Sequence, residues 1–186
     1  MATNDIGGNV TAGIEGATVN STSAVIDVRA TSNANIHTLT VAGSGAGAVA
    51  AGASVSLNAI SKTVDAHING AANVDSPTAI RITAEDTSLI ESLSGGFAGA
   101  GTVGVGVALA TNDITSSVTA SIGGGDVNSA GNDVEIVADS NSTVRTLSAA
   151  IAGSGAAAVA GSISLNQVNG TAAAHISRGQ PVPAGM

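Results

Sequence analysis

Apolar and polar residues alternate with a period of two along most of this chain. In residues 26–30, Ile, Val and Ala are separated by Asp and Arg, and residues 49–57 and 60–68 show similar alternation. Because successive side chains of a β-strand point to opposite faces, this period predicts strands. The phase of the alternation changes after Asn58. This change predicts a bend or a β-bulge near Asn58 and Ala59.

The alternation belongs to a longer repeat. Three sets of identical residues stand 54 positions apart: Ile14, Ile68, Ile122 and Ile176; Leu39, Leu93 and Leu147; and Asn58, Asn112 and Asn166. The repeats cover residues 10–63, 64–117 and 118–171, and residues 172–176 begin a fourth. A long fixed period is typical of stacked repeats, which bury their apolar faces against one another. We therefore expect an all-β fold, in which residues 10–176 form one parallel β-helix (β-solenoid) domain.

The two ends of the chain depart from this pattern. Residues 1–9 are expected to be an N-terminal lead-in, and residues 177–186 a C-terminal tail or linker. The first residues lack the basic region and apolar run of a signal peptide, so none is expected in this segment.

A coil that contained a whole repeat would be long for a β-solenoid. Each repeat is therefore expected to contain two unlike coils of about 27 residues. Val28 would then lie over Val55, and the chain would form six to seven rungs about 4.8 Å apart. Segments that vary between the repeats have the composition of surface turns. These segments are residues 20–23, 75–78 and 128–131.

Glycine-rich stretches recur at residues 42–49, 96–103 and 150–157. A helix is disfavoured there, because each glycine inside a helix costs about 1 kcal/mol relative to alanine. Both faces of such a strand carry only small groups. We expect these strands to be buried on both sides or to pack flat against a neighbouring sheet.

Composition and charge exclude several classes of protein. Hydrophobic residues make up 44% of the chain, which is too many for a disordered segment. The net charge of −8 argues against nucleic acid and against electrostatic docking to anionic lipid. The chain has no cysteine, so disulfides are excluded.

Recurring polar positions offer the most specific structural chemistry. Asn58, Asn112 and Asn166 could form a ladder of side-chain amides along the stack, as in other stacked β structures. The alternative is an asparagine favoured by a left-handed turn. Neither interpretation gives these residues a catalytic role.

Two columns of charged residues change sign from repeat to repeat. One contains Asp27, Arg81 and Glu135, and the other contains His37, Glu91 and Arg145. Stacked neighbours of opposite sign would pair along the rod and help to set the register. The alternative is that they are unpaired surface charges. Exposed pairs are worth about 0–1 kcal/mol in either case.

Candidate catalytic and metal-binding chemistry is sparse. Asp126 and Asp133 lie near a Gly-Gly-Gly-Asp sequence and are the candidate ligands for calcium. The same residues also suit a turn. No other cofactor is expected. His67 and His175 share a repeat position, but Ser121 replaces histidine between them. The carboxylates are expected at outward-facing or turn positions. We therefore expect neither a metal site at the histidines nor an enzyme.

One uncharged stretch raises the question of a membrane. Residues 95–110 contain no charged residue. This run is nevertheless shorter than a membrane-spanning helix, which needs about 18 residues or more. A buried strand is the favoured interpretation. A membrane-active toxin segment remains a third functional hypothesis.

The phrase at residues 43–60, GSGAGAVAAGASVSLNAI, and its copy at residues 153–168 resemble repeats of large secreted bacterial exoproteins. These are the filamentous-haemagglutinin-like and leukotoxin-like filamentous adhesins. The resemblance covers residues 10–176. It implies a right-handed parallel β-helix stalk, export across an outer membrane and a role in attachment. The family supplies no catalytic residues to transfer.

The preferred hypothesis is a non-catalytic stalk segment of a bacterial surface or secreted adhesin or extracellular fibre. Its partners would be neighbouring repeats or copies of itself, and the surface of a host or a neighbouring cell. The alternative is a subunit that stacks into filaments through exposed strand edges. Either function places the protein outside the cell or on its surface.

Overall fold

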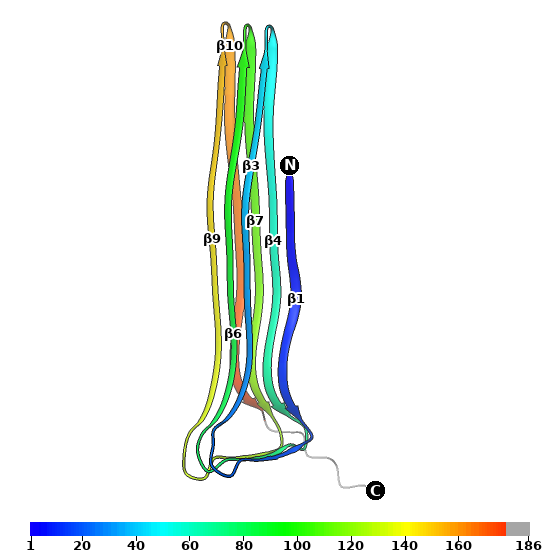
Figure 1. The fold of residues 1–186 in the computed structure, drawn as a ribbon, viewed down its shortest axis with the longest axis vertical. Coiled ribbons are helices and arrows are strands. Elements are labelled where there is room, and N and C mark those ends of the chain that lie inside the picture. The colour runs from blue at the N-terminus through cyan, green and yellow to red at the C-terminus, as the bar shows by residue number, and fades with distance from the viewer. Residues whose placement is uncertain (178–186) are drawn as a thin grey trace.

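A computed structural model describes residues 1–177 of the chain, which form ten strands and no helix (Figure 1). The long strands are β1 (Ala2–Glu15), β3 (Ile26–Ala46), β4 (Val49–Asn69), β6 (Ile80–Ala100), β7 (Val103–Gly123), β9 (Val134–Ser154) and β10 (Ala157–Ser177). The short strands are β2 (Thr18–Asn20), β5 (Asn73–Asp75) and β8 (Asp126–Asn128).

Each long strand pairs in parallel with the strand one repeat further along the chain. Asn58 in β4 pairs with Asn112 in β7, 54 residues away. In the same way Ile82 in β6 pairs with Ile136 in β9. One coil of the solenoid is therefore one whole repeat. The all-β parallel solenoid expected from the sequence is confirmed.

The prediction of two short coils in each repeat was wrong. Val28 pairs with Ile82, and Val55 pairs with Leu109, so Val28 does not lie over Val55. A single coil accommodates the whole repeat because β3 and β4 each contain 21 residues and form its two long sides. The sheets are three or four strands deep rather than six to seven rungs. The half-period was inferred because the two long strands of each repeat have a similar alternation of apolar and polar residues.

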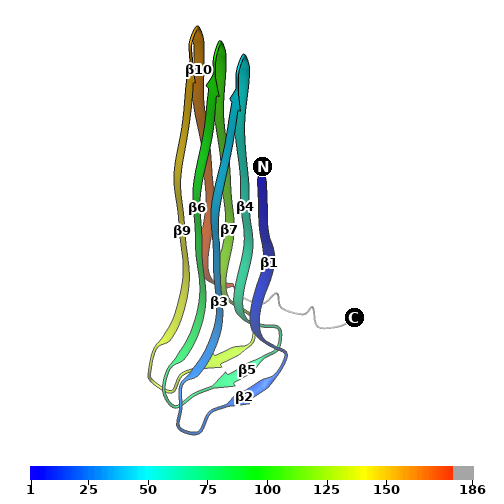
Figure 2. The same ribbon diagram turned by 45° about the horizontal axis from the view of Figure 1, so that its top comes forward.

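The coils stack into three sheets, with strand orders β1-β4-β7-β10, β3-β6-β9 and β2-β5-β8. The two sheets of long strands lie face to face along the length of the molecule. The chain passes from one to the other at the upper tips, as between Ala46 and Val49 (Figure 1). The sheet of short strands closes the opposite end, where each coil is wider (Figure 2).

The tip half of each coil is called the arm below, and comprises residues 38–58, 92–112 and 146–166. The other described residues form the base. The base has a core of branched apolar residues under a polar surface. Its buried residues include Val28, Ile36, Ile60, Val64, Ile68, Val74, Ile80, Ile82, Ile90, Ile114 and Val118. Burial of these side chains is the main driving force for stacking the base.

The arm reverses this arrangement. Its interior contains small residues, among them Ser92, Ser94, Ala98, Ala108 and Ala110. Its larger apolar residues point outward, among them Leu39, Val41, Leu93, Phe97, Val107, Leu147 and Ile151. β4 nevertheless continues without interruption from Val49 to Asn69 and pairs residue by residue with β7. The predicted bend or bulge at Asn58 and Ala59 was therefore wrong. The phase changes because the apolar residues move from the outer to the inner face there.

Glycine allows the two long sheets to approach closely within the arm. A methyl group added to Gly96 would overlap the carbonyl oxygen of Val107, and one added to Gly52 would overlap that of Phe97. No side chain larger than hydrogen fits at either position. Of the two arrangements expected for the glycine-rich stretches, the structure shows the second, in which each strand packs flat against a neighbouring sheet.

Several boundaries differ from those expected. Residues 1–9 are not a lead-in, because β1 begins at Ala2 and pairs with β4. Residues 172–176 complete β10, which ends at Ser177. The rest of the predicted tail, residues 178–186, lies outside the described residues. The three predicted turn segments each begin at the last residue of a short strand and lead towards the next long strand.

The described part of the chain, residues 1–177, includes no apolar helix of a length that crosses a membrane.

Candidate functional site

A ladder of asparagine amides runs through the interior at the boundary between arm and base. Asn58 Nδ2 donates to Asn112 Oδ1, and Asn112 Nδ2 donates to Asn166 Oδ1, each at 2.8 Å. The structure thus brings together the three predicted residues. Asn4 adds a fourth, since its Nδ2 lies 2.8 Å from Asn58 Oδ1. The sequence contained this signal, because Asn4 precedes Asn58 by one repeat, but it fell within the supposed lead-in.

Threonine hydroxyls from the facing sheet complete this ladder. Thr38 Oγ1 donates to Asn58 Oδ1 at 2.8 Å, and Thr146 Oγ1 donates to Asn166 Oδ1 at 2.9 Å. The hydrogen bonds therefore connect successive coils and also the two sides of one coil. Because buried amides are costly when unpaired, this network favours one register of stacking.

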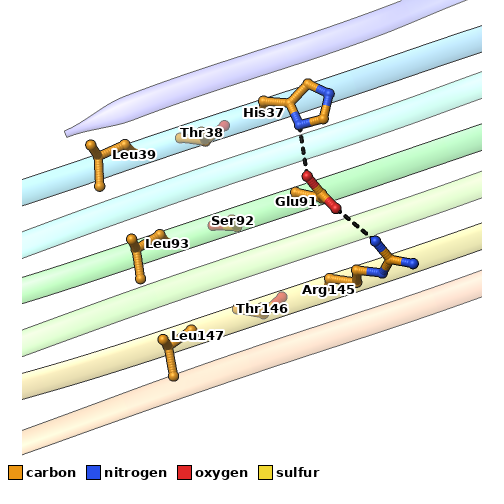
Figure 3. A pocket seen from close by; sticks show the side chains of 9 residues that line it. All are labelled: His37, Thr38, Leu39, Glu91, Ser92, Leu93, Arg145, Thr146 and Leu147. Atoms are coloured by element: carbon orange, nitrogen blue, oxygen red, sulfur yellow. Dashed lines mark hydrogen bonds and ion pairs between the residues drawn. The ribbon is translucent and has the colours of Figure 1, made fainter.

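A ladder of charges lies on the outer face of β3, β6 and β9, next to the asparagine ladder. His37 Nδ1 is 3.0 Å from Glu91 Oε2, and Arg145 Nη1 donates to Glu91 Oε1 at 2.9 Å (Figure 3). The parallel register makes these residues direct neighbours, so the pairing expected from the sequence is present. The hydrogen bond from Arg145 lowers the pKa of Glu91 more than burial raises it, and the contact with His37 lowers it further.

Beside the charge ladder lies an open groove of about 530 Å³. Its lining residues are His37, Thr38, Leu39, Glu91, Ser92, Leu93, Arg145, Thr146 and Leu147. The three leucines form an exposed apolar row parallel to the charges (Figure 3). The hydroxyl groups of Thr38, Ser92 and Thr146 point into the interior and hydrogen bond there, so none faces His37 as a nucleophile. The groove therefore presents an apolar row beside a row of His, Glu and Arg.

The second predicted charge column is only partly paired. Arg81 Nε lies 3.1 Å from Glu135 Oε2. Asp27 is in register with Arg81, but the ion pairs found in residues 1–177 do not include this one. A further pair joins Arg29 and Glu85 at 3.8 Å. All are at the surface, where such pairs stabilise little.

Sequence reasoning missed the contacts of His67. This residue is on the outer face of β4, yet its side chain is buried, because the ring covers Gly13 of β1. Its Nε2 lies 2.9 Å from Glu15 Oε1, and its Nδ1 lies 2.5 Å from Asp65 Oδ2. Burial lowers the pKa of His67, but the hydrogen bonds and charges of Glu15 and Asp65 raise it above its ordinary value of 6.5. Gly13, in register with His67, was the available signal.

Asp86 corrects the expectation that all carboxylates face outward or lie in turns. It points into the base and is fully buried. The hydroxyls of Ser88 and Ser116 donate to its Oδ2 at 2.9 and 2.8 Å. Its Oδ1 has no partner among the described residues. The alternation placed Asp86 on the inner face, but the usual exposure of aspartate argued against that position.

The calcium candidates lie apart from any cluster of ligands in the described residues. Asp126 begins β8, and Asp133 immediately precedes β9. Their backbone groups hold neighbouring coils in place, since Asp126 N donates to Ala72 O and Ile80 N donates to Asp133 O. Within residues 1–177 no group of three or more His, Cys, Asp or Glu side chains is arranged to hold a metal ion. His175 is at the outer face of β10, in register with Ser121.

The two ladders and their groove are therefore the best-defined candidate site, and the chemistry of the site is that of stacking and surface contact. Comparison with known proteins adds no family to this description, because the chain matches no protein-family model, no curated protein and no solved structure.

Proposed function

We propose that this chain is a non-catalytic stalk segment of a bacterial surface or secreted adhesin or extracellular fibre. The observation that supports this function is the unbroken 54-residue register of the long strands, which carries the asparagine ladder and the apolar core from coil to coil. The residues that recur from repeat to repeat are those that make stacking interactions, and they do not line a pocket. A stalk needs such interactions along its axis.

The mechanism of a stalk is mechanical. The backbone hydrogen bonds of parallel sheets lie along the stacking direction, so a pull along the axis acts on two long ladders at once. The amides of Asn58 and Asn112 add side-chain hydrogen bonds in the same direction. Further coils would lengthen the rod by about 4.8 Å each. The resemblance to filamentous adhesins supports a location outside the cell or on its surface.

The direct test uses antibodies raised against the 186-residue chain. Applied to intact cells of the source organism, they should label the cell surface or material released from it. Labelling that requires permeabilised cells would contradict the proposal. The purified chain should not compete with whole cells for attachment, because a stalk segment holds a binding region and does not itself bind the receptor.

A second function, self-assembly into filaments, is favoured by the strand edges that the described residues leave unpaired. Ile176 in β10 is 69% exposed, whereas its partner Ile122 in β7 is 6% exposed. The side-chain amide nitrogen of Asn166 has no hydrogen-bond partner among the described residues, and neither has the side-chain oxygen of Asn4 at the other end. A following copy could extend the core and the ladder together.

Two measurements separate this second function from the first. Filaments in electron micrographs should disappear in Ile176→Lys, which places a charge in the stacked core, and should persist in His175→Lys on the outer face. Each copy has a net charge of −8, so copies that stack on one another repel. Salt should therefore promote filaments by screening this repulsion. A chain that remains monomeric at high concentration and high salt excludes the second function.

A further inference from the structure

The outer faces of the arm are apolar on both sides of the molecule. Leu93 and Phe97, on the outer face of β6, are 44% and 43% exposed. Val107, on the outer face of β7, is 42% exposed. These residues belong to the middle coil and have a coil on each side, so their exposure is outward and not a consequence of the open stack end.

Charge is absent from the same region. Residues 38–61, 92–112 and 146–174 contain no Asp, Glu, Lys or Arg. The charged ladder of His37, Glu91 and Arg145 lies at the border of this uncharged region (Figure 3). A continuous exposed apolar surface on a folded protein marks a place of contact with something else.

A lipid bilayer fits this surface poorly. The arm is long enough, since nine residue steps from His37 to Ala46 span about 30 Å, similar to the hydrocarbon core. However, among residues 1–177 β9 and β10 are edge strands throughout the arm, with unpaired backbone groups along one side. Open sheet edges are not found in the hydrocarbon region, where each unsatisfied backbone group costs several kcal/mol.

A second copy of the chain fits better, because sheets pack on sheets through flat faces of this kind. The outer face of β3, β6 and β9 alternates larger and smaller columns along the strands. The row Leu39, Leu93 and Leu147 is followed by Val41, Gly95 and Ala149, then by Gly43, Phe97 and Ile151. The ring of Phe97 lies over Gly95, so Leu93 and Phe97 form one apolar surface on the middle coil, and a copy with the same spacing between rungs can lay the same surface against it. We propose that the apolar faces of the arm bind the arms of other copies side by side, so that stacks associate into layers.

The size of the face sets the strength of this contact. Three strands about 4.8 Å apart and about 30 Å long present roughly 400 Å² on each face. A stable dimer buries about 800 Å² per partner, so two single chains should associate weakly and only at high concentration. Longer stacks would associate more strongly because the contacts act together. Faces on both sides of the arm would give open-ended layers rather than a closed dimer.

The test compares two matched double variants of the full chain. Leu93→Lys with Val107→Lys places two charges on the outer faces of β6 and β7 in the arm. Thr87→Lys with Thr115→Lys places the same charges on the same faces of the same strands in the base, where both threonines are exposed. Association is followed by sedimentation and light scattering over a concentration series, with circular dichroism to verify folding.

The wild type should associate as its concentration rises, and the assemblies should diffract at a face-to-face spacing of about 10 Å. The arm variant should need about tenfold more protein or should not associate, because burying unpaired ammonium groups is costly. The base variant should behave as the wild type. A wild type that remains monomeric at the highest attainable concentration overturns the proposal, and so does equal association of both variants.

Two further measurements do not depend on a charged variant folding. The chain lacks cysteine, so Leu93→Cys and Thr87→Cys each provide one thiol. Under oxidation in concentrated solution, the cysteine at position 93 should form intermolecular disulfides more readily than the one at position 87. Equal cross-linking contradicts the proposal. The protein should not float with neutral phosphatidylcholine vesicles. Flotation that is lost in the Leu93→Lys, Val107→Lys variant would show that the apolar faces bind a bilayer instead of a second copy.

Discussion

The base and the arm are built from the same strands and stabilised in different ways. In β6, Ile82 of the base is buried and Arg81 faces outward, whereas further along the strand Ser92 of the arm is buried and Leu93 faces outward. The base therefore resembles an ordinary protein with an apolar core. The arm has its small polar and glycine residues inside, and its stability depends on backbone ladders and close approach of two sheets.

The boundary between these halves coincides with the two ladders. Asn58 and Thr38 hydrogen bond across the interior at the position where the apolar residues change face. His37, the neighbour of Thr38, is the last basic side chain on β3 before the apolar surface begins. A polar layer at this position satisfies buried groups between two unlike interiors. It also fixes which residue of one coil lies over which residue of the next.

The largest difference between the halves should appear when one apolar side chain is shortened in each. Ile82→Ala in the base removes a fully buried side chain and should lower the free energy of unfolding by about 2–5 kcal/mol. Leu93→Ala, on the other face of the same strand, should change it by less than about 0.5 kcal/mol. Urea denaturation of both variants checks this. Equal losses would mean that the arm has an apolar core after all.

The close approach of the sheets in the arm is tested by adding one methyl group. Gly96→Ala would place a methyl against the carbonyl oxygen of Val107 and should destabilise the chain by about 1–3 kcal/mol. Gly99→Ala, on the outer face of the same strand, has nothing within 4 Å of the added carbon and should be tolerated. Thermal unfolding distinguishes the two. Tolerance of alanine at Gly96 would show that the sheets can separate without cost.

The polar boundary is tested by removing one rung of its ladder. Asn112→Ala deprives Asn58 and Asn166 of a partner in the interior, and should cost about 1–3 kcal/mol because buried amide groups lose hydrogen bonds. Asn141→Ala, on the exposed outer face of β9, is the control and should change stability little. Hydrogen exchange should show faster opening near Asn112 in the first variant alone. If both variants match the wild type, the ladder does not determine the register.

The sequence predicted the strands and the repeat, because both follow directly from spacing, and it gave the asparagine ladder as one of two interpretations. It did not predict the interior of the arm. A period of two shows which residues share a face, and in residues 49–57 the rule that apolar faces point inward selects the wrong one. The opposite face, with Gly52 and Ser54, is the one that permits close packing. The presence of glycine on one face and valine on the other could have indicated that the glycine face packs against the opposite sheet.

The size of the coil was missed for a related reason. The two long strands of one repeat alternate similarly, so an offset of half a repeat aligns apolar positions almost as well as a whole repeat does. The length of a straight strand cannot be predicted from the spacing of residues in the sequence, because it depends on close contact with the opposite sheet. Once the coil is known to be one whole repeat, contact of His37 with Glu91 follows at once. To predict the contacts of His67, one must also know that its side chain lies over Gly13 of the neighbouring strand.

The smallest expected effect concerns the surface of the base, where His67 adds a pH dependence that the uncharged arm lacks. Both ring nitrogens of His67 face carboxylate oxygens, at 2.9 Å from Glu15 and 2.5 Å from Asp65. Only the protonated ring can donate to both, which explains why the pKa of His67 is raised above 6.5 despite the opposing effect of burial. The resulting stability is fully present below the unfolded pKa and is lost as the pH rises through the folded value.

His67→Ser is the variant that tests this, since Ser121 occupies the same position in the next coil without disturbing the stack. Its stability loss relative to the wild type should be larger at about pH 6 than at about pH 9, because the contribution of a histidine with a raised pKa falls as the pH rises. A loss for His67→Ser that is the same at both pH values would show that the ring acts by covering Gly13. Its charge would then contribute nothing to the stability of the base.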